Sequence, residues 1–101
     1  MGLAHFNNRM NQIETRIAEL VNWVRVDGAY CCRLQSVRDM VEKPATVLVM
    51  MRCQYQDASF EVHYGSARGE APEEDDAILK RRIALGIVKI FARTKMNERL
   101  T

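Results

Sequence analysis

Apolar side chains recur at intervals of three and four residues over the first quarter of the chain, which predicts an amphipathic helix over residues 3–25. The recurring residues are Phe6, Met10, Ile13, Ile17, Leu20 and Val24. Three more apolar residues widen this surface beyond one stripe: Ala18, Val21 and Trp23. One interpretation is a helix laid on its own sheet; the other is a helix that also contacts a second subunit. The sequence DG at 27–28 ends the helix.

Residues 44–65 alternate between apolar and polar side chains, which is typical of a β-hairpin. The alternating apolar residues are Val47, Val49, Met51, Cys53 and Tyr55 before the turn, and Phe60, Val62 and Tyr64 after it. The polar residues Ser59, Glu61 and His63 are expected to point to the other face. Pro44 stands at the entry of the first strand, where a missing backbone donor is tolerated.

Residues 29–43 fit two patterns. Tyr30, Cys32 and Leu34 alternate as in a strand, whereas a second set recurs as in a helix: Leu34, Val37, Met40 and Val41. We favour the strand, which predicts one α+β domain over residues 1–101 in the order αβββα, with two helices flanking a small antiparallel sheet. The alternative order, ααββα, places a hairpin after two helices, as in a winged helix-turn-helix protein.

The segment GSARGEAP at 65–72 predicts a loop, and a second helix is expected to start at Pro72 or Glu73. Four acidic residues, Glu73 to Asp76, complement the positive end of its dipole. One face of this helix holds Leu79, Ile83, Gly86, Ile87, Ile90 and Phe91. The opposite face holds Ile78, Leu85, Val88, Ala92 and Met96. A helix that is apolar on both faces needs two neighbours.

A three-stranded sheet covers one side of the second helix, so we expect a homodimer or a higher oligomer to cover the other side. The expected subunit contacts are Met10, Ile13, Ile17, Leu20, Leu85, Val88 and Ala92. A further partner protein is expected, whose identity the sequence does not give.

The composition fits a small folded domain: 101 residues and 11.6 kDa, 48% of them apolar and 28% charged. No stretch approaches the roughly 18 to 20 apolar residues of a membrane span, and the first residues lack a signal-peptide core. Three cysteines are an odd count in a chain without an export signal. We therefore expect reduced thiols and a cytoplasmic protein.

The net charge of +2 is small, but its distribution is uneven. Residues 70–76 hold five acids, and residues 77–101 hold seven bases and one acid. Sequence-specific contact with DNA by the second helix is not expected, because Lys89 is the only polar residue in the run from 83 to 92. A dimer could still hold phosphates without sequence preference. The residues for this are Arg81, Arg82, Arg93, Lys95 and Arg99, with Arg33, Arg38 and Arg52 as contributors from the sheet.

The order αβββα, the length and the expected dimer resemble in outline the small bacterial nucleoid-associated proteins of the YbaB type. The resemblance concerns element order alone, and it assigns no binding residue.

Catalytic and metal-binding motifs are not found. The cysteines and histidines have no paired metal-ligand spacing, so we expect no metal and no cofactor. Adjacent Cys31 and Cys32 should point to opposite faces of a strand, one buried and one exposed. Cys53 and His63 are the one pair that could serve as nucleophile and base, but the alternation places them on opposite sides of the sheet.

The sequence therefore favours a non-enzymatic, oligomeric interaction protein: a small adaptor, or a regulator or inhibitor of a larger macromolecular machine, of a kind that phages and other mobile elements also encode. The alternative is a dimer that binds nucleic acid without sequence preference. A small enzyme that uses Cys53 or His63 is the third hypothesis.

Overall fold

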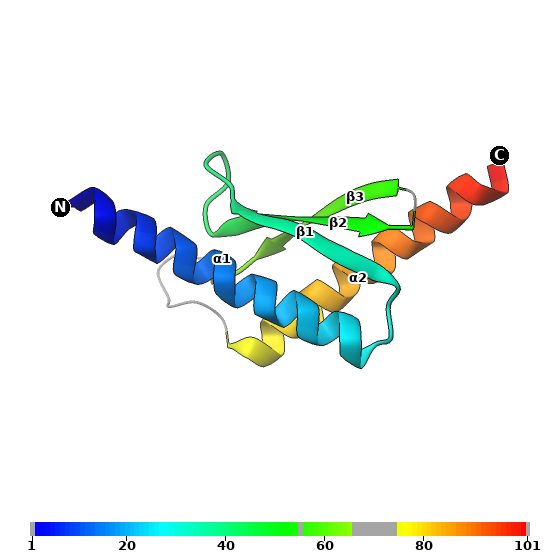
Figure 1. The fold of residues 1–101 in the computed structure, drawn as a ribbon, viewed down its shortest axis with the longest axis horizontal. Helices are drawn as coiled ribbons and strands as arrows, with labels where there is room; N and C mark the ends of the chain where they lie inside the picture. The colour runs from blue at the N-terminus through cyan, green and yellow to red at the C-terminus, as the bar shows by residue number, and fades with distance from the viewer. Residues whose placement is uncertain (1, 55, 66–74, 101) are drawn as a thin grey trace.

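The structure, a computed structural model, describes residues 2–54, 56–65 and 75–100, with side chains described for 12–54, 56–65 and 75–93. Its elements follow in the order α1 (Gly2–Asp27), β1 (Cys32–Asp39), β2 (Thr46–Cys53), β3 (Gln56–His63) and α2 (Asp76–Leu100). Figure 1 shows this arrangement. The predicted α+β order αβββα is confirmed, and the alternative ααββα is wrong because β1 is a strand.

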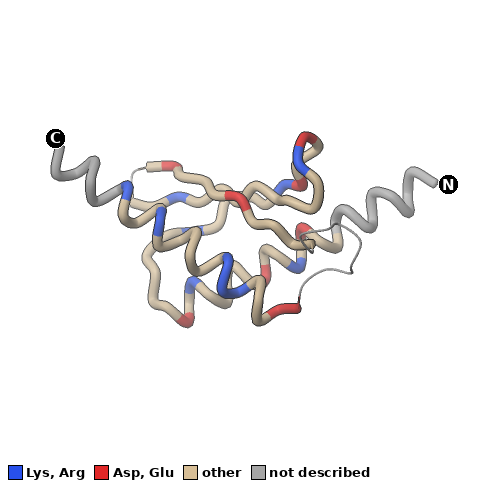
Figure 2. Tube along the Cα trace, turned by 180° about the vertical axis from the view of Figure 1, so that it is seen from behind, with Lys and Arg blue, Asp and Glu red and all other residues tan. Residues whose placement is uncertain are grey.

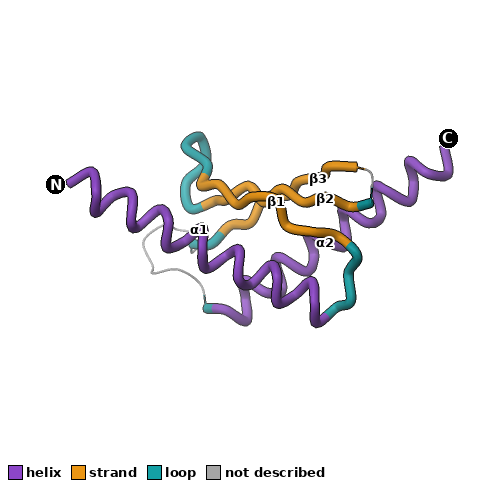
Figure 3. Tube along the Cα trace, viewed as in Figure 1, coloured by secondary structure: helices purple, strands orange, loops and turns teal. Residues whose placement is uncertain are grey.

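The molecule has two layers (Figure 3). One is an antiparallel sheet in the order β1-β2-β3, and the other is formed by the two helices, which lie on the same face of the sheet. Helix α1 lies against β1, α2 lies against β3, and the helices also contact each other. The helices extend past the sheet toward opposite ends, which makes the molecule 51 Å long and 25 Å across.

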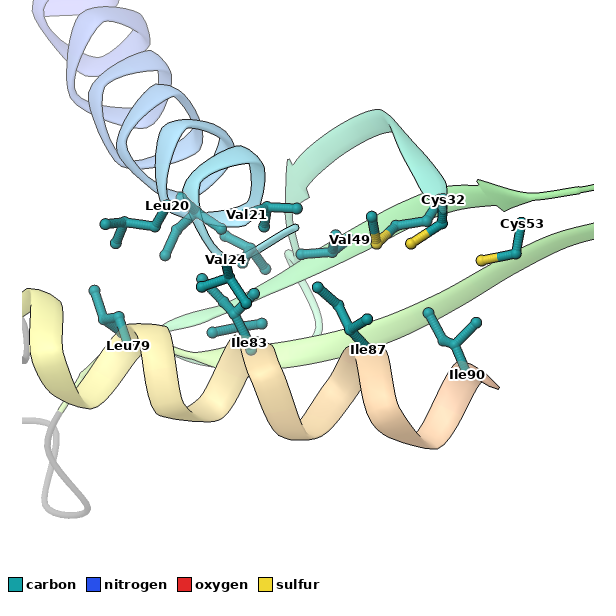
Figure 4. Close-up of a cluster of buried hydrophobic side chains, with 14 of the residues drawn as sticks. Leu20, Val21, Val24, Cys32, Val49, Cys53, Leu79, Ile83, Ile87 and Ile90 are labelled. Carbon is teal, nitrogen blue, oxygen red and sulfur yellow. The ribbon is translucent and has the colours of Figure 1, made fainter. Parts of the chain in front are cut away.

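The core fills the space between the layers (Figure 4). Side chains of α1, β2 and α2 meet there, and Ile17, Val49 and Ile87 are fully buried. Burial of one such aliphatic side chain contributes about 1.5–3 kcal/mol relative to its exposure. The predicted inward positions of β2 are confirmed, since all four are buried: Val47, Val49, Met51 and Cys53. Tyr55 lies outside the described residues.

The irregular pattern of residues 29–43 has its cause in the sheet register. Cys32 lies opposite Cys53 and Leu34 opposite Met51, but the register then shifts between Leu34 and Ser36. Because of this bulge, Val37 returns to the inner face three residues after Leu34, opposite Val49. A bulged strand thus gave the three-residue spacing of a helix.

Helix α2 begins at Asp76, later than the predicted Pro72 or Glu73. The side-chain Oδ1 of Asp75 accepts a hydrogen bond of 3.0 Å from the backbone N–H of Ile78. This is the geometry of an N-cap residue, which stands outside the helix that it caps. Residues 72–74 lie outside the described part of the chain. Among the described residues, neither helix combines the length and apolar composition of a membrane span.

Candidate interaction surface

The side of α2 that faces away from the sheet exposes three apolar residues on adjacent turns, Leu85, Val88 and Ala92, here called the α2 crest. Leu85 is 58% exposed and Val88 is 50% exposed. The opposite face of the helix is buried, as predicted, through Leu79, Ile83, Gly86, Ile87 and Ile90. The sheet and α1 therefore cover part of α2 and leave the crest in solvent.

A groove of about 600 Å³ lies beside the crest, between α2 and β3. We call it the β3–α2 groove. Its apolar lining comes mainly from Phe60, Leu85 and Ile90. Its basic lining comes from Arg82, Lys89 and Arg93, whose spacing of seven and four residues places them on one side of the helix. The remaining lining residues are Leu48, Ser59, Glu61, His63 and Gly86.

Close packing between Phe60 and Gly86 forms the bottom of this groove. A Cβ atom at position 86 would lie 2.2 Å from the ring carbon Cδ2 of Phe60, which is far inside van der Waals contact. The glycine therefore lets the ring of β3 rest directly on the helix backbone.

Arg82 ties the two walls of the groove together, because its guanidinium donates a hydrogen bond to the backbone carbonyl of His63. Glu61 is the acidic residue in the lining, and Lys43 forms an ion pair of 2.6 Å with it. Lys89 and Arg93 are exposed. The groove thus combines an apolar bottom with an excess of positive charge along α2.

Figure 2 shows the same asymmetry over the coloured part of α2: Lys and Arg follow the helix, and an acidic position stands at its start. From Ala77 to Arg93 the sequence contains no Asp or Glu. One of these bases has a local role, since the ammonium of Lys80 lies 3.7 Å from the ring centre of Trp23 on α1.

The outer face of the sheet has a different character. Arg52 pairs with Asp57 at 3.1 Å, and Gln35 donates a hydrogen bond of 3.2 Å to the same carboxylate. Polar pairs of this kind are typical of the solvated face of an antiparallel sheet. We therefore place the candidate surface on α2 and not on the sheet.

The predicted subunit contacts fall into two groups. Ile13, Ile17 and Leu20 are buried within the chain's own core, where they pack against the sheet and α2. The α2 crest is exposed. The side chain of Met10 lies outside the described residues. The expectation of a second subunit now rests on the crest.

The predicted phosphate-binding residues are also divided. Arg81 and Arg93 are exposed on α2, and Arg82 is bound to β3. The side chains of Lys95 and Arg99 lie outside the described residues. The strand positions Arg33, Arg38 and Arg52 pair with β2 or β1 on the outer face, away from the helices. The structure therefore does not join the two sets into one basic patch.

The cysteines lie as predicted: Cys31 is exposed, while Cys32 and Cys53 are buried. Burial, the neighbouring Cys32 thiol and a hydrogen bond with it raise the pKa of Cys53 from 9.0 to about 11. Such a thiol is almost wholly protonated at neutral pH and is a poor nucleophile. Cys53 faces the core, and His63 lies on the other face of the hairpin beside Thr46. Within the described residues no three metal-ligating side chains come together.

Comparisons with protein-family models, with curated proteins and with solved structures find no match in any of the three. The outline resemblance to YbaB-type proteins accordingly extends no further than the shared element order.

Sequence reasoning found the crest but missed the groove. The crest follows from helical spacing alone, whereas the groove depends on how closely β3 approaches α2. The signal for that approach was Gly86, the one glycine in an otherwise apolar helical run.

Proposed function

We propose that this chain is a non-enzymatic, oligomeric interaction protein of the adaptor or regulator type, and that α2 is its contact element. The observation that supports this proposal is the α2 crest, where Leu85 and Val88 leave half or more of their surface in solvent. Adjacent exposed apolar residues on a small protein are typical of an interaction site.

A second copy of the chain is the partner that we assign to the crest. Two α2 helices that pack side by side through Leu85, Val88 and Ala92 would cover the apolar surface that the sheet leaves open. The same contact brings the basic side chains of two acid-free helix segments together. These positive charges repel each other, and salt screens the repulsion. The dimer should therefore become tighter as the salt concentration rises.

A regulator of this kind needs no reaction centre, and the polar chemistry of the described residues agrees with that role. The raised pKa of Cys53 keeps the thiol protonated, and His63 lies across the sheet from it. Substitution of Cys53 should therefore leave the interactions of the folded protein unchanged.

Light scattering at low and at physiological salt tests the proposal, with and without a mixed-sequence DNA duplex. We expect a dimer whose fraction rises with salt, and no change in mass upon addition of DNA. Val88→Asp should give a folded monomer, because it places a charge in the subunit contact. A wild-type monomer under all conditions would contradict the assignment of the crest.

Binding of nucleic acid is the second candidate function, and the exposed bases of α2 favour it. Lys89 and Arg93 point into the groove, and Arg81 is exposed on the same helix. Phosphate binding weakens steeply as salt rises, because it releases counterions. The opposite sign of the two salt dependences separates the two candidates in one experiment.

A further inference from the structure

We propose that the β3–α2 groove binds an extended, acidic segment of another protein, which pairs with the free edge of β3 as a fourth strand. The inference rests on the proposed function, because it names the chemistry of a partner that α2 helps to hold. It concerns the groove beside the crest. Leu85 borders both surfaces, whereas Val88 and Ala92 do not line the groove.

The two edges of the sheet differ in a way that favours β3. The edge strand β1 contains a bulge between Leu34 and Ser36, and bulges protect an edge from further pairing. The edge strand β3 pairs with β2 in an unbroken register from Gln56 to His63. Among the described residues its neighbour in the sheet is β2, and no other described strand lies along its outer edge. A regular edge of this length is a template for strand addition.

The direction of the backbone groups follows from two hydrogen bonds. The carbonyl of Thr46 accepts a bond from the N–H of Met40, so the backbone of Thr46 faces β1. His63 lies opposite Thr46, and its carbonyl accepts the bond from Arg82 on the other side. Backbone groups alternate in direction along an antiparallel strand.

By this alternation, the N–H and C=O groups of Asp57, Ser59 and Glu61 also face the free edge. Arg82 occupies the end of that edge at His63. The rest of this edge is available to an added strand, and its outward-facing residues Asp57, Ser59 and Glu61 are all exposed.

The side chains around the edge define what the added strand should contain. Phe60 and Leu85 offer an apolar contact, which suits an aliphatic side chain. Lys89 and Arg93 supply positive charge beside that contact, and α2 has no acid between Ala77 and Arg93 to balance it. Alternate residues of a strand point to the same face of the sheet. Aliphatic residues and carboxylates at every second position, all facing α2, with neutral polar residues between them, therefore complement this groove.

Nucleic acid fits the same groove less well. A nucleic-acid backbone along this edge carries one negative charge per nucleotide, so Asp57 and Glu61 would repel it. A peptide can present neutral groups next to these two residues. A second copy of this chain fits poorly too, since its α2 would add bases to a groove that already holds Arg82, Lys89 and Arg93.

The test uses a fluorescein-labelled, acetylated peptide of eight residues, the length of β3, in which leucine and glutamate share every second position and threonine occupies the positions between. Fluorescence anisotropy measures its affinity for the full chain. We expect binding, and we expect the double substitution Lys89→Glu, Arg93→Glu to weaken it by about tenfold or more. The matched control, Arg33→Glu with Arg38→Glu, changes the charge equally on the outer face of the sheet and should leave the affinity unchanged.

Two further measurements address the strand addition itself. Bound peptide should slow hydrogen exchange at the amides of Ser59 and Glu61. Exchange at the amide of Val37, which faces the free edge of β1, should stay unchanged. Ser59→Pro should abolish peptide binding, because it removes the N–H that the peptide would bind. The variant should still fold, because this N–H points away from β2 and proline is tolerated at such positions of an edge strand. Circular dichroism confirms that each variant is folded.

Several outcomes would overturn the inference. These are no binding of the peptide, equal loss of binding in the outer-face control, or unchanged exchange at Ser59 and Glu61. A single-stranded oligothymidine of equal charge that binds more tightly than the peptide would assign the groove to nucleic acid. Failure here is distinct from failure of the proposed function, because the effect of Val88→Asp on the dimer does not involve the groove.

Discussion

Phe60 of β3 rests directly on the backbone of α2 at Gly86, at a distance that leaves no room for a Cβ atom. This contact sets how closely the edge of the sheet approaches the helix, and so sets the shape of the groove between them. The contact thus connects the edge strand β3 with α2, the helix to which we assign the contacts with other molecules.

A larger side chain at position 86 should push the ring of Phe60 away. We expect Gly86→Val to destabilise the protein by about 1–3 kcal/mol through overpacking, which outweighs the gain in helix propensity. Chemical unfolding measures the change. In a Phe60→Ala background the same substitution should cost less, and additive effects of the two substitutions would contradict the contact.

Ile87 and Val88 are neighbours in sequence but have opposite environments, since Ile87 is fully buried and Val88 is 50% exposed. Ile87→Asp should therefore unfold the protein or destabilise it by about 4 kcal/mol or more, because it buries an unpaired charge. Val88→Asp should lower the melting temperature far less, by no more than the loss of the subunit contact. Equal melting temperatures for the two variants would contradict the placement of α2.

Much of this architecture follows from the sequence. The alternation of residues 44–65 predicts the hairpin and its inward side chains, and the charge order of the last third predicts α2 and its direction. The bulge after Leu34 could not be predicted, because a shift of register imitates helical spacing. The N-cap residue Asp75 could not be predicted either. Any of the four consecutive acids could cap the helix, so the sequence does not determine where α2 begins.

The sequence predicts only those parts of the candidate surface that are formed by a single helix or strand. Leu85, Val88 and Ala92 share a face of α2 whatever the tertiary structure is. Whether Ile17 faces a partner or its own core depends on the position of α1 over the sheet, and a periodic pattern does not contain that information. The groove requires two elements that are distant in sequence to meet at Phe60 and Gly86.

The buried thiol of Cys53 should make stability depend on alkaline pH. The folded-state pKa of about 11 lies above the ordinary value of 9.0, so the unfolded chain loses this proton first. The stabilising contribution is complete below pH 9 and is lost as pH rises from 9 to about 11. Cys53→Ala should show a weaker loss of stability over this range in urea unfolding. The matched control is Cys31→Ala, which should behave like the wild type because Cys31 is exposed.

The three thiols should also differ in reactivity toward a thiol reagent. Cys31 is exposed and should react rapidly with the native protein, whereas Cys32 and Cys53 should react only when the structure opens. Mass spectrometry of the native protein should show one adduct, and the unfolded protein should show three. Rapid modification of Cys53 in the native state would contradict its burial in the core.

The central claim is that the exposed side of α2 joins copies of the chain, and light scattering of wild type and Val88→Asp tests it most directly. We predict a wild-type dimer that becomes tighter as salt rises, and a folded monomer for the variant at every salt concentration. The same mass for both proteins, with both folded, would contradict the claim.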